Sequence, residues 1–272
     1  MIAELWPFAL ALLATGLFAG VLSGMLGVGG GIIIVPVLYH SFRLIGFPED
    51  MLMHVAVGTS LATIIPTTIR TMMKHAEKGA VDFVVLKSWA PGIVLGVLAG
   101  SLVADVVSGR VLMIVFASMA MVFAVNLSFV KDSWTIGDRV PFGFGGTAIA
   151  SVMGFFSTLM GIGGGTFGVA ALTLFGMPIH RAVATAAGFG TVIAIPGTIG
   201  YMIGGWDQEG LPPYSLGYVS LIGFALIVPA TVFAAPLGVR LAHAMDRAVL
   251  RRVFAVFLAL TSARMFMDLL AV

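Results

Sequence analysis

The stretch SGMLGVGGG at residues 23–31 returns as STLMGIGGG at residues 157–165, beginning 134 residues later (157 − 23). Each copy follows a long apolar segment and precedes a short one, Ile32–Phe42 or Thr166–Gly176. Glycine releases the backbone from helical torsion angles, so three consecutive glycines predict a broken helix. We call residues 27–31 the first glycine loop and residues 161–165 the second glycine loop.

A second pair of matching stretches extends the repeat along the chain. IPTTI at residues 65–69 resembles IPGTI at residues 195–199, which begins 130 residues later (195 − 65). The chain is therefore predicted to be a duplication. The first transmembrane repeat covers residues 1–130, a cytoplasmic linker covers residues 131–141, and the second transmembrane repeat covers residues 142–272.

The composition places both repeats in a membrane. Of the 272 residues, 60% are hydrophobic and 10% are charged, and the mean hydropathy is +1.11. Soluble domains are about 25% charged, so lipid is the solvent that fits this chain. We expect an all-α polytopic protein with five apolar segments in each repeat: Pro7–Leu26, Ile32–Phe42, Val55–Met73, Phe83–Val107, Val111–Val130, then Phe142–Met160, Thr166–Gly176, Ala182–Ile203, Leu216–Ala242 and Ala248–Leu270.

The basic residues indicate that the repeats are inverted. Cytoplasmic loops collect Lys and Arg. If each pair of a long and a short segment crosses the membrane once, the 14 Lys and Arg residues divide equally, with seven on each side of the membrane. Each pair could instead be a hairpin, either re-entrant or fully spanning. Both termini then lie outside, and the basic residues on the outside are only Arg43, Arg110 and Arg264. The other eleven are then cytoplasmic: Arg70, Lys74, Lys78, Lys87, Lys131, Arg139, Arg181, Arg240, Arg247, Arg251 and Arg252.

Several classes of function lack the residues that they need. The chain has no cysteine, which excludes disulfides and thiolate chemistry, and a net charge of +2 does not indicate nucleic-acid binding. No carboxylate lies deep in an apolar segment, and no metalloprotease motif is present, so we expect neither an enzyme nor a metal or other cofactor. The first seven residues lack Lys and Arg, so the first apolar segment is expected to stay in the mature protein.

The glycine loops are the predicted substrate site. The short helix after each loop directs its free N–H groups and positive dipole end toward the glycines, which suits an anion. In inverted repeats two such ends can meet near the bilayer midplane. The alternative is that the glycines only allow close helix packing.

Hydroxyl groups near the loops complete the set of candidates. A hydroxyl can donate a hydrogen bond to an oxyanion without binding it too tightly for release. Bonding to carbonyls of their own helix is the alternative for these side chains. The substrate-binding candidates are Ser23, Gly29, Gly30, Gly31, Thr59, Ser60, Ser157, Gly163, Gly164, Gly165, Thr166 and Thr185.

Four further residues have predicted roles outside this set. Pro66 and Pro196 lie inside helices of the two repeats, where each removes a backbone donor and is a hinge candidate. Arg70 is a candidate for the cytoplasmic mouth, and its extension to lipid headgroups is the favoured alternative. His54 lies at a helix start, where a role in pH sensing is an alternative to a structural one.

The two glycine clusters, the VGTSL stretch at residues 57–61 and the whole-chain duplication resemble the sulfite exporter TauE/SafE family of membrane permeases. The resemblance implies transport of a sulfur-containing oxyanion or organosulfonate, such as sulfite or sulfoacetate. The second half departs from the pattern, because ATAA at residues 184–187 stands where Gly-Thr-Ser would be.

The expected partners are therefore a small anionic substrate and membrane lipids. An anion channel or facilitator and a carrier for a small carboxylate are the alternative functions. The sequence leaves open the exact substrate, the direction of transport, the coupling ion and whether the protein forms a homodimer.

Overall fold

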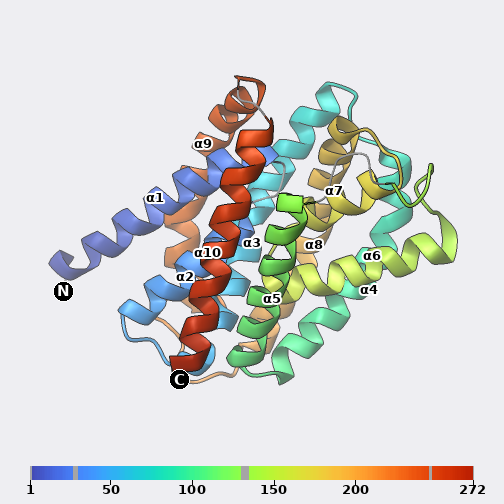
Figure 1. Cartoon of the computed structure of the whole chain (residues 1–272). Coiled ribbons are helices and arrows are strands. Elements are labelled where there is room, and N and C mark those ends of the chain that lie inside the picture. The colour runs from blue at the N-terminus through green and yellow to red at the C-terminus, as the bar shows by residue number, and fades with distance from the viewer. Residues whose placement is uncertain (1, 27–29, 130–134, 245–246, 272) are drawn as a thin grey trace.

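A computed structural model describes residues 2–26, 30–129, 135–244 and 247–271. These residues form ten helices and one two-stranded hairpin (Figure 1). The helices of the first half are α1 (Ile2–Leu26), α2 (Gly31–Leu44), α3 (Glu49–Glu77), α4 (Phe83–Val106) and α5 (Gly109–Phe129). Those of the second half are α6 (Gly143–Met160), α7 (Gly165–Leu174), α8 (Ile179–Gly204), α9 (Leu221–Ala244) and α10 (Arg247–Ala271).

Each of the ten predicted apolar segments corresponds to one of these helices, which confirms the prediction of an all-α protein. Several helices begin or end a few residues from the predicted bounds, and at one start the type of secondary structure was wrong. The predicted segment Leu216–Ala242 begins in a hairpin of β1 (Ser215–Leu216) and β2 (Val219–Ser220), and α9 starts only at Leu221. Gly217 turns the hairpin with φ +54°, and a Cβ there would lie 2.1 Å from the Met202 carbonyl oxygen. This close approach holds the hairpin against the end of α8.

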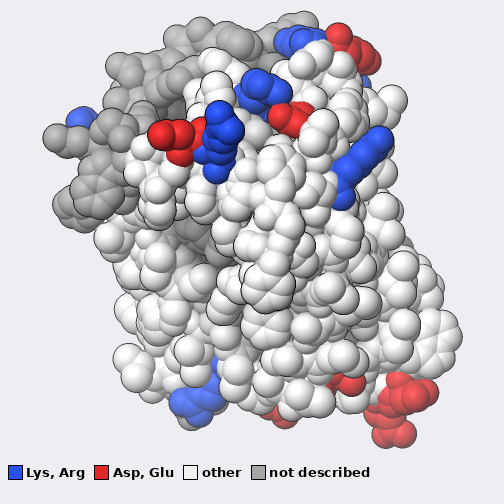
Figure 2. Space-filling model, turned by 90° about the vertical axis from the view of Figure 1, so that its right-hand side faces the viewer, with Lys and Arg blue, Asp and Glu red and all other residues white. Residues whose placement is uncertain are grey.

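The surface matches a membrane environment. Among the described residues, six helices are long and apolar enough to cross a bilayer: α3, α4, α5, α6, α8 and α9. Figure 2 shows charged side chains gathered at two opposite ends of the molecule, with an uncharged belt between them. Large apolar side chains are exposed on the spanning helices, such as Leu102 at 72% and Leu95 at 60% on α4. An exposed apolar belt of this kind is stable when lipid covers it.

The halves interlock. Helix α1 packs along α9, α4 along α6, α3 along α8 and α5 along α10. When the two halves are matched helix by helix, α1 corresponds to α6 and α9 to α4, so the first pair corresponds to the second. The other two pairs, α3 with α8 and α5 with α10, each join corresponding helices. The residue contacts follow the same rule. A Cβ on Gly20 would lie 2.6 Å from the Thr231 carbonyl oxygen, and one on Gly154 would lie 2.4 Å from the Ile93 carbonyl oxygen.

Helices α3 and α8 lie at the centre of this arrangement. In the most apolar stretch of each, 83% of α3 and 67% of α8 is buried, against 33–44% for the other four spanning helices. Their Pro66 and Pro196 lie within helices that continue on both sides. The central position brings α3 against Gly31 and Gly161 and α8 against Gly164.

Polar contacts join neighbouring helix ends at each of the two opposite ends of the molecule. Arg43 at the end of α2 pairs with Asp268 of α10 at 3.2 Å, and Arg110 at the start of α5 donates to the Leu269 carbonyl. At the opposite end of the molecule, Arg181 of α8 pairs with Asp82 before α4 at 2.8 Å. Helices α5 and α10 lie side by side and run in opposite directions between these ends (Figure 1).

Candidate functional site

The two glycine loops meet inside the protein. A Cβ placed on Gly31 would lie 2.4 Å from the Gly161 carbonyl oxygen and 3.1 Å from the Ile162 Cα. Gly161 ends α6 with φ +65°, where glycine is the residue with least strain, and Gly31 begins α2. The contact therefore joins the end of one broken helix to the beginning of the other.

Helix α3 packs against this contact through the segment singled out in the sequence. The Ser60 hydroxyl donates to the Gly161 carbonyl oxygen at 2.7 Å. A Cβ on Gly161 would lie 2.9 Å from the Val57 Cα. Thr59, the neighbour of Ser60, accepts a 2.8 Å hydrogen bond from the Ser220 N–H of β2. Ser60 thus faces the glycine loops, whereas Thr59 holds the hairpin.

Helix α8 packs against the second glycine loop. A Cβ on Gly164 would lie 2.5 Å from the Phe189 Cβ and 2.9 Å from the Gly190 nitrogen. Gly163 lies against Ile64 of α3, with 3.1 Å between its ideal Cβ and the Ile64 Cγ2 atom. The loop is therefore held between the two central helices, and close packing explains why glycine occupies these positions.

Two hydroxyls beside the second glycine loop are buried without a hydrogen-bond partner. They belong to Ser157, in the last turn of α6, and to Thr166, in the first turn of α7. Ser157 is fully buried, as is Ser23 of α1 at 2% exposure. Buried hydroxyls nearly always have a partner, so these two groups are available to one.

The short helices after the loops begin without a side-chain cap. Gly30, with φ +77°, precedes α2, and Gly164 precedes α7. The Gly30 carbonyl accepts from Ile33 and Ile34, and the Gly164 carbonyl accepts from Gly168. The N–H groups of a first helical turn have no partner within the helix, so they and the positive dipole end remain for another acceptor.

Other candidates lie away from the loop contact. Thr185 accepts from the Asp82 backbone N–H at 2.9 Å, near one end of the molecule. Arg70 is exposed toward the end of α3. Gly165 is buried as the first residue of α7. Gly29 lies outside the described residues.

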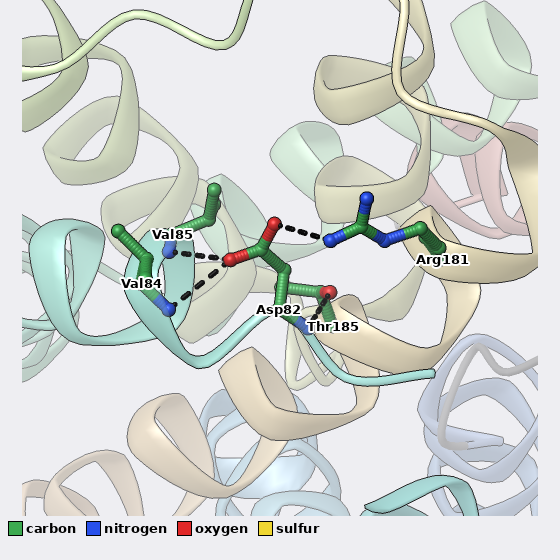
Figure 3. A network of polar contacts seen from close by, with 5 residues as sticks. All are labelled: Asp82, Val84, Val85, Arg181 and Thr185. Atoms are coloured by element: carbon green, nitrogen blue, oxygen red, sulfur yellow. Dashed lines mark hydrogen bonds and ion pairs between the residues drawn. The ribbon is translucent and has the colours of Figure 1, made fainter. Parts of the chain in front are cut away.

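The network around Asp82 was not foreseen (Figure 3). Its carboxylate accepts from the Val84 and Val85 N–H groups, which caps α4, and it pairs with Arg181. Thr185 completes the link from α8 to the Asp82 backbone. Asp82 at a helix start is a recognisable capping pattern, but the sequence did not reveal its partners on α8.

The alternative of bonding within the helix holds for several hydroxyls. Each of these donates to a carbonyl three or four residues earlier: Thr63, Thr67, Thr68, Thr71 and Thr158. Thr68 also accepts from the Thr191 hydroxyl at 3.2 Å, which joins α3 to α8. These hydroxyls therefore use their donor within their own helices.

Sequence reasoning also missed an aromatic cluster around His54. Its ring stacks on Tyr218 with centroids 4.8 Å apart, and Tyr201 lies edge-on to Tyr218 at 6.4 Å. The position of His54 at a helix start was noted. Tyr201 and Tyr218 come from the far half of the chain, and no local pattern connects them to it.

Apolar crossing helices, an uncharged belt and two broken helices that meet in the interior define a polytopic membrane protein of the transporter class. The comparison with known sequences makes the assignment specific. The chain belongs to the sulfite exporter TauE/SafE family, whose profile matches residues 12–265.

Curated relatives agree with this assignment. A probable membrane transporter protein of Haemophilus influenzae is 33% identical over 97% of this chain and 100% of its own length. A probable membrane transporter protein of Methanocaldococcus jannaschii is 28% identical over 85% of each chain. The probable membrane transporter protein YunE of Bacillus subtilis is 25% identical over 94% of this chain and 97% of its own. No solved structure matches the chain.

Proposed function

We propose that this protein is a permease for a small anion that binds between the two glycine loops. The observation that carries the proposal is the contact of Gly31 with the Gly161 carbonyl. Each loop leaves backbone polar groups inside a membrane protein, which is tolerable where they line a pathway or bind a solute. The duplication brings both loops to one place, as in many transporters.

The chemistry around the loops favours an anion. Two uncapped helix starts present N–H donors, and the unpartnered Ser157 and Thr166 hydroxyls add two more. Ser60 donates to the Gly161 carbonyl, which leaves that oxygen less able to attract a cation. Donors without a fixed positive charge bind an oxyanion reversibly, which a carrier requires.

The substrate class comes from the family. Its name supports sulfite, and the donor set would suit the similar oxygen atoms of an organosulfonate such as sulfoacetate. A small carboxylate presents the same charge with fewer oxygens and is the competing substrate class. A panel of solutes therefore has to include both.

The inverted arrangement of the repeats that we propose would let such a site open alternately to the two sides of the membrane. Helices α5 and α10 occupy equivalent places in the two halves and run antiparallel side by side. A two-fold axis that relates them lies across the helices, in the plane of the membrane. The glycine loops would then reach the centre from opposite sides, and their close contact corresponds to a closed state that must separate to admit a solute.

The predicted orientation places both termini outside. Arg43, Arg110 and Arg264 come from three helices but lie near Asp268 and Leu269 at one end of the molecule. These are the three bases that the sequence assigns to the outside. Because the chain has no cysteine, single cysteines at Leu44 and Ile136, which are 89% and 78% exposed, test the assignment directly. An impermeant maleimide should label Leu44→Cys, and not Ile136→Cys, in intact cells.

The function is tested with purified protein and a panel of sulfite, sulfate, sulfoacetate, taurine and lactate. A substrate should raise the unfolding temperature through binding linkage, and the same solute should show saturable counterflow in proteoliposomes. Unitary currents would instead indicate the channel alternative. Stabilisation by lactate alone would favour the carboxylate carrier, and counterflow with no member of the panel would contradict the proposal.

A further inference from the structure

A second polar site lies apart from the glycine loops, between α3, α4 and α8. It is a narrow crevice whose polar lining comes from His54, Ser101, Asp105, Tyr201 and Tyr218. The Ser101 hydroxyl is buried without a partner. The crevice is near the start of α3 and the ends of α4 and α8, at the end of the molecule that also holds Arg43 and Glu49.

His54 is the buried histidine of this crevice. It is 5% exposed, and its Nε2 atom lies 3.0 Å from the Ala104 carbonyl oxygen and 3.2 Å from that of Val107. A carbonyl can only accept, so Nε2 carries a proton. Nδ1 is then the basic atom of the neutral ring, and it is buried without a hydrogen-bond partner.

The groups around the ring suit a second proton. The two carbonyls belong to Ala104, in the last turn of α4, and to Val107, which follows it, and the negative dipole end of α4 favours a cation. Asp105 of α4 lines the same crevice, as do Tyr201 of α8 and Tyr218 beside β2, and Asp50 lies one turn earlier on α3. Arg110 at the start of α5 is directed to the Leu269 carbonyl of α10.

A chain of contacts leads from this crevice to the second glycine loop. His54 stacks on Tyr218, and Tyr218 lies against Tyr201. The Tyr201 hydroxyl donates to the Thr158 carbonyl oxygen at 3.3 Å, and the same oxygen accepts from the Gly161 N–H. The Tyr218 carbonyl also lies 2.5 Å from an ideal Cβ on Gly58, beside Thr59 and Ser60. A change in charge at His54 thus acts on residues that hold both sides of the loop contact.

We propose that His54 is the proton-binding site that couples solute movement to the transmembrane pH gradient. This inference rests on the proposed function. Histidine changes its charge between about pH 5 and pH 8, where cells maintain such gradients. The two tyrosines connect the protonated ring to the Thr158 carbonyl and the second glycine loop.

The first test measures proton binding without a transported solute. Nuclear magnetic resonance of isotopically labelled histidine, with protein in lipid nanodiscs, gives one signal for each of the five histidines. The His54 signal is identified by its loss in His54→Gln. We expect it to titrate reversibly between about pH 5 and pH 8. A His54 signal that stays neutral over this range would overturn the proposal.

The second test separates coupling from transport with radiolabelled sulfite and sulfoacetate in proteoliposomes. Glutamine keeps a donor for the Ala104 and Val107 carbonyls but cannot take up a proton, so His54→Gln should retain counterflow. It should lose accumulation driven by a pH gradient, which for one proton per solute reaches about tenfold for each pH unit in the unmodified protein. His75→Gln, at the other end of α3, is the matched control and should keep both activities.

The outcomes distinguish the two proposals. Absence of counterflow in the unmodified protein would contradict the permease function and leave the His54 titration as an independent result. Counterflow with gradient-driven accumulation that survives in His54→Gln would overturn the coupling role alone. Accumulation driven by a sodium gradient and indifferent to pH would overturn it as well.

Discussion

The Ser60 hydroxyl of α3 donates a 2.7 Å hydrogen bond to the carbonyl oxygen of Gly161, 101 residues later in the chain. The acceptor lies at the C-terminal end of α6, where a helix leaves its last carbonyls without partners of its own. Ser60 therefore supplies one missing partner of the broken helix. A residue of the first repeat thus stabilises the glycine loop of the second.

Removing this bond should weaken the loop contact. Ser60→Ala leaves a buried carbonyl with one donor fewer, and we expect it to lower the free energy of unfolding by about 1 kcal/mol. Thermal unfolding in detergent measures the change. The control is Thr67→Val, which is equally buried but removes only a bond to the Thr63 carbonyl of its own helix. An equal effect of the two substitutions would contradict a special role for Ser60.

The packing of α1 on α9 and of α6 on α4 gives a prediction about the repeats. Gly20 and Gly154 are 134 residues apart (154 − 20), and their ideal Cβ atoms lie 2.6 Å and 2.4 Å from carbonyl oxygens of the facing helices. Backbone cannot move aside as a side chain can. Gly20→Ala and Gly154→Ala should therefore each destabilise the protein by about 1–3 kcal/mol, with similar shifts in unfolding temperature.

Gly145 of α6 is the matched control for both substitutions. An ideal Cβ there meets nothing within 4 Å, so alanine adds helix propensity without a clash. Gly145→Ala should be neutral or stabilise by roughly 0.5–1 kcal/mol. If Gly20→Ala also behaved in this way, the interlocked packing of the halves would be wrong.

The sequence predicted the helices well because their determinants are local. The length of each apolar stretch identified the spanning segments, and the glycine clusters identified the helix breaks before α2 and α7. The start of α9 was misplaced because Leu216 and Val219 are apolar yet belong to a hairpin around Gly217. Apolar character alone does not separate a short hairpin from a helix start.

The site was predicted only in part because its contacts join distant residues. The repeat placed both glycine loops together, but which hydroxyls face them depends on helix rotation. Ser60 faces the loops, whereas Thr59 faces β2 and Thr185 faces Asp82. Arg264 and Asp268 are four residues apart on α10, and they pair at 3.7 Å. The closer contact of Asp268 with Arg43, at 3.2 Å, could not be read from that spacing.

The contacts of Asp82 predict an order of effects at one end of the molecule. Its carboxylate caps α4 by accepting from two backbone N–H groups, whereas its ion pair reaches an Arg181 side chain that is 55% exposed. Asp82→Ala should cost about 0.5–2 kcal/mol of unfolding free energy through the lost cap. Arg181→Ala should cost less than about 1 kcal/mol, because solvent screens the pair. Thermal unfolding at low and high salt measures both changes. If the ion pair were the dominant contact, the two substitutions would cost about the same at low salt, because each of them removes the pair.

The hydroxyl of Ser157 has no hydrogen-bond partner, so a substitution there tests whether its role is to bind the anion or to stabilise the fold. It is fully buried and bonded to nothing, so Ser157→Ala removes an unsatisfied group and should leave stability unchanged or raise it by about 1 kcal/mol. If the hydroxyl donates to the transported anion, the same substitution should weaken anion binding by about 10- to 100-fold. Thermal shifts with titrated sulfite or sulfoacetate, together with the half-saturation of counterflow, measure this loss.

Thr198 of α8 is the control that makes the result specific. Its hydroxyl is also buried without a partner, but it lies eight residues beyond Gly190, about 12 Å along the helix from the contact with Gly164. Thr198→Val should match Ser157→Ala in stability and leave anion affinity unchanged. Equal affinities in the unmodified protein and Ser157→Ala would remove Ser157 from the site. A loss of affinity confined to Ser157→Ala would mean that its hydroxyl is unpartnered because its partner is the solute.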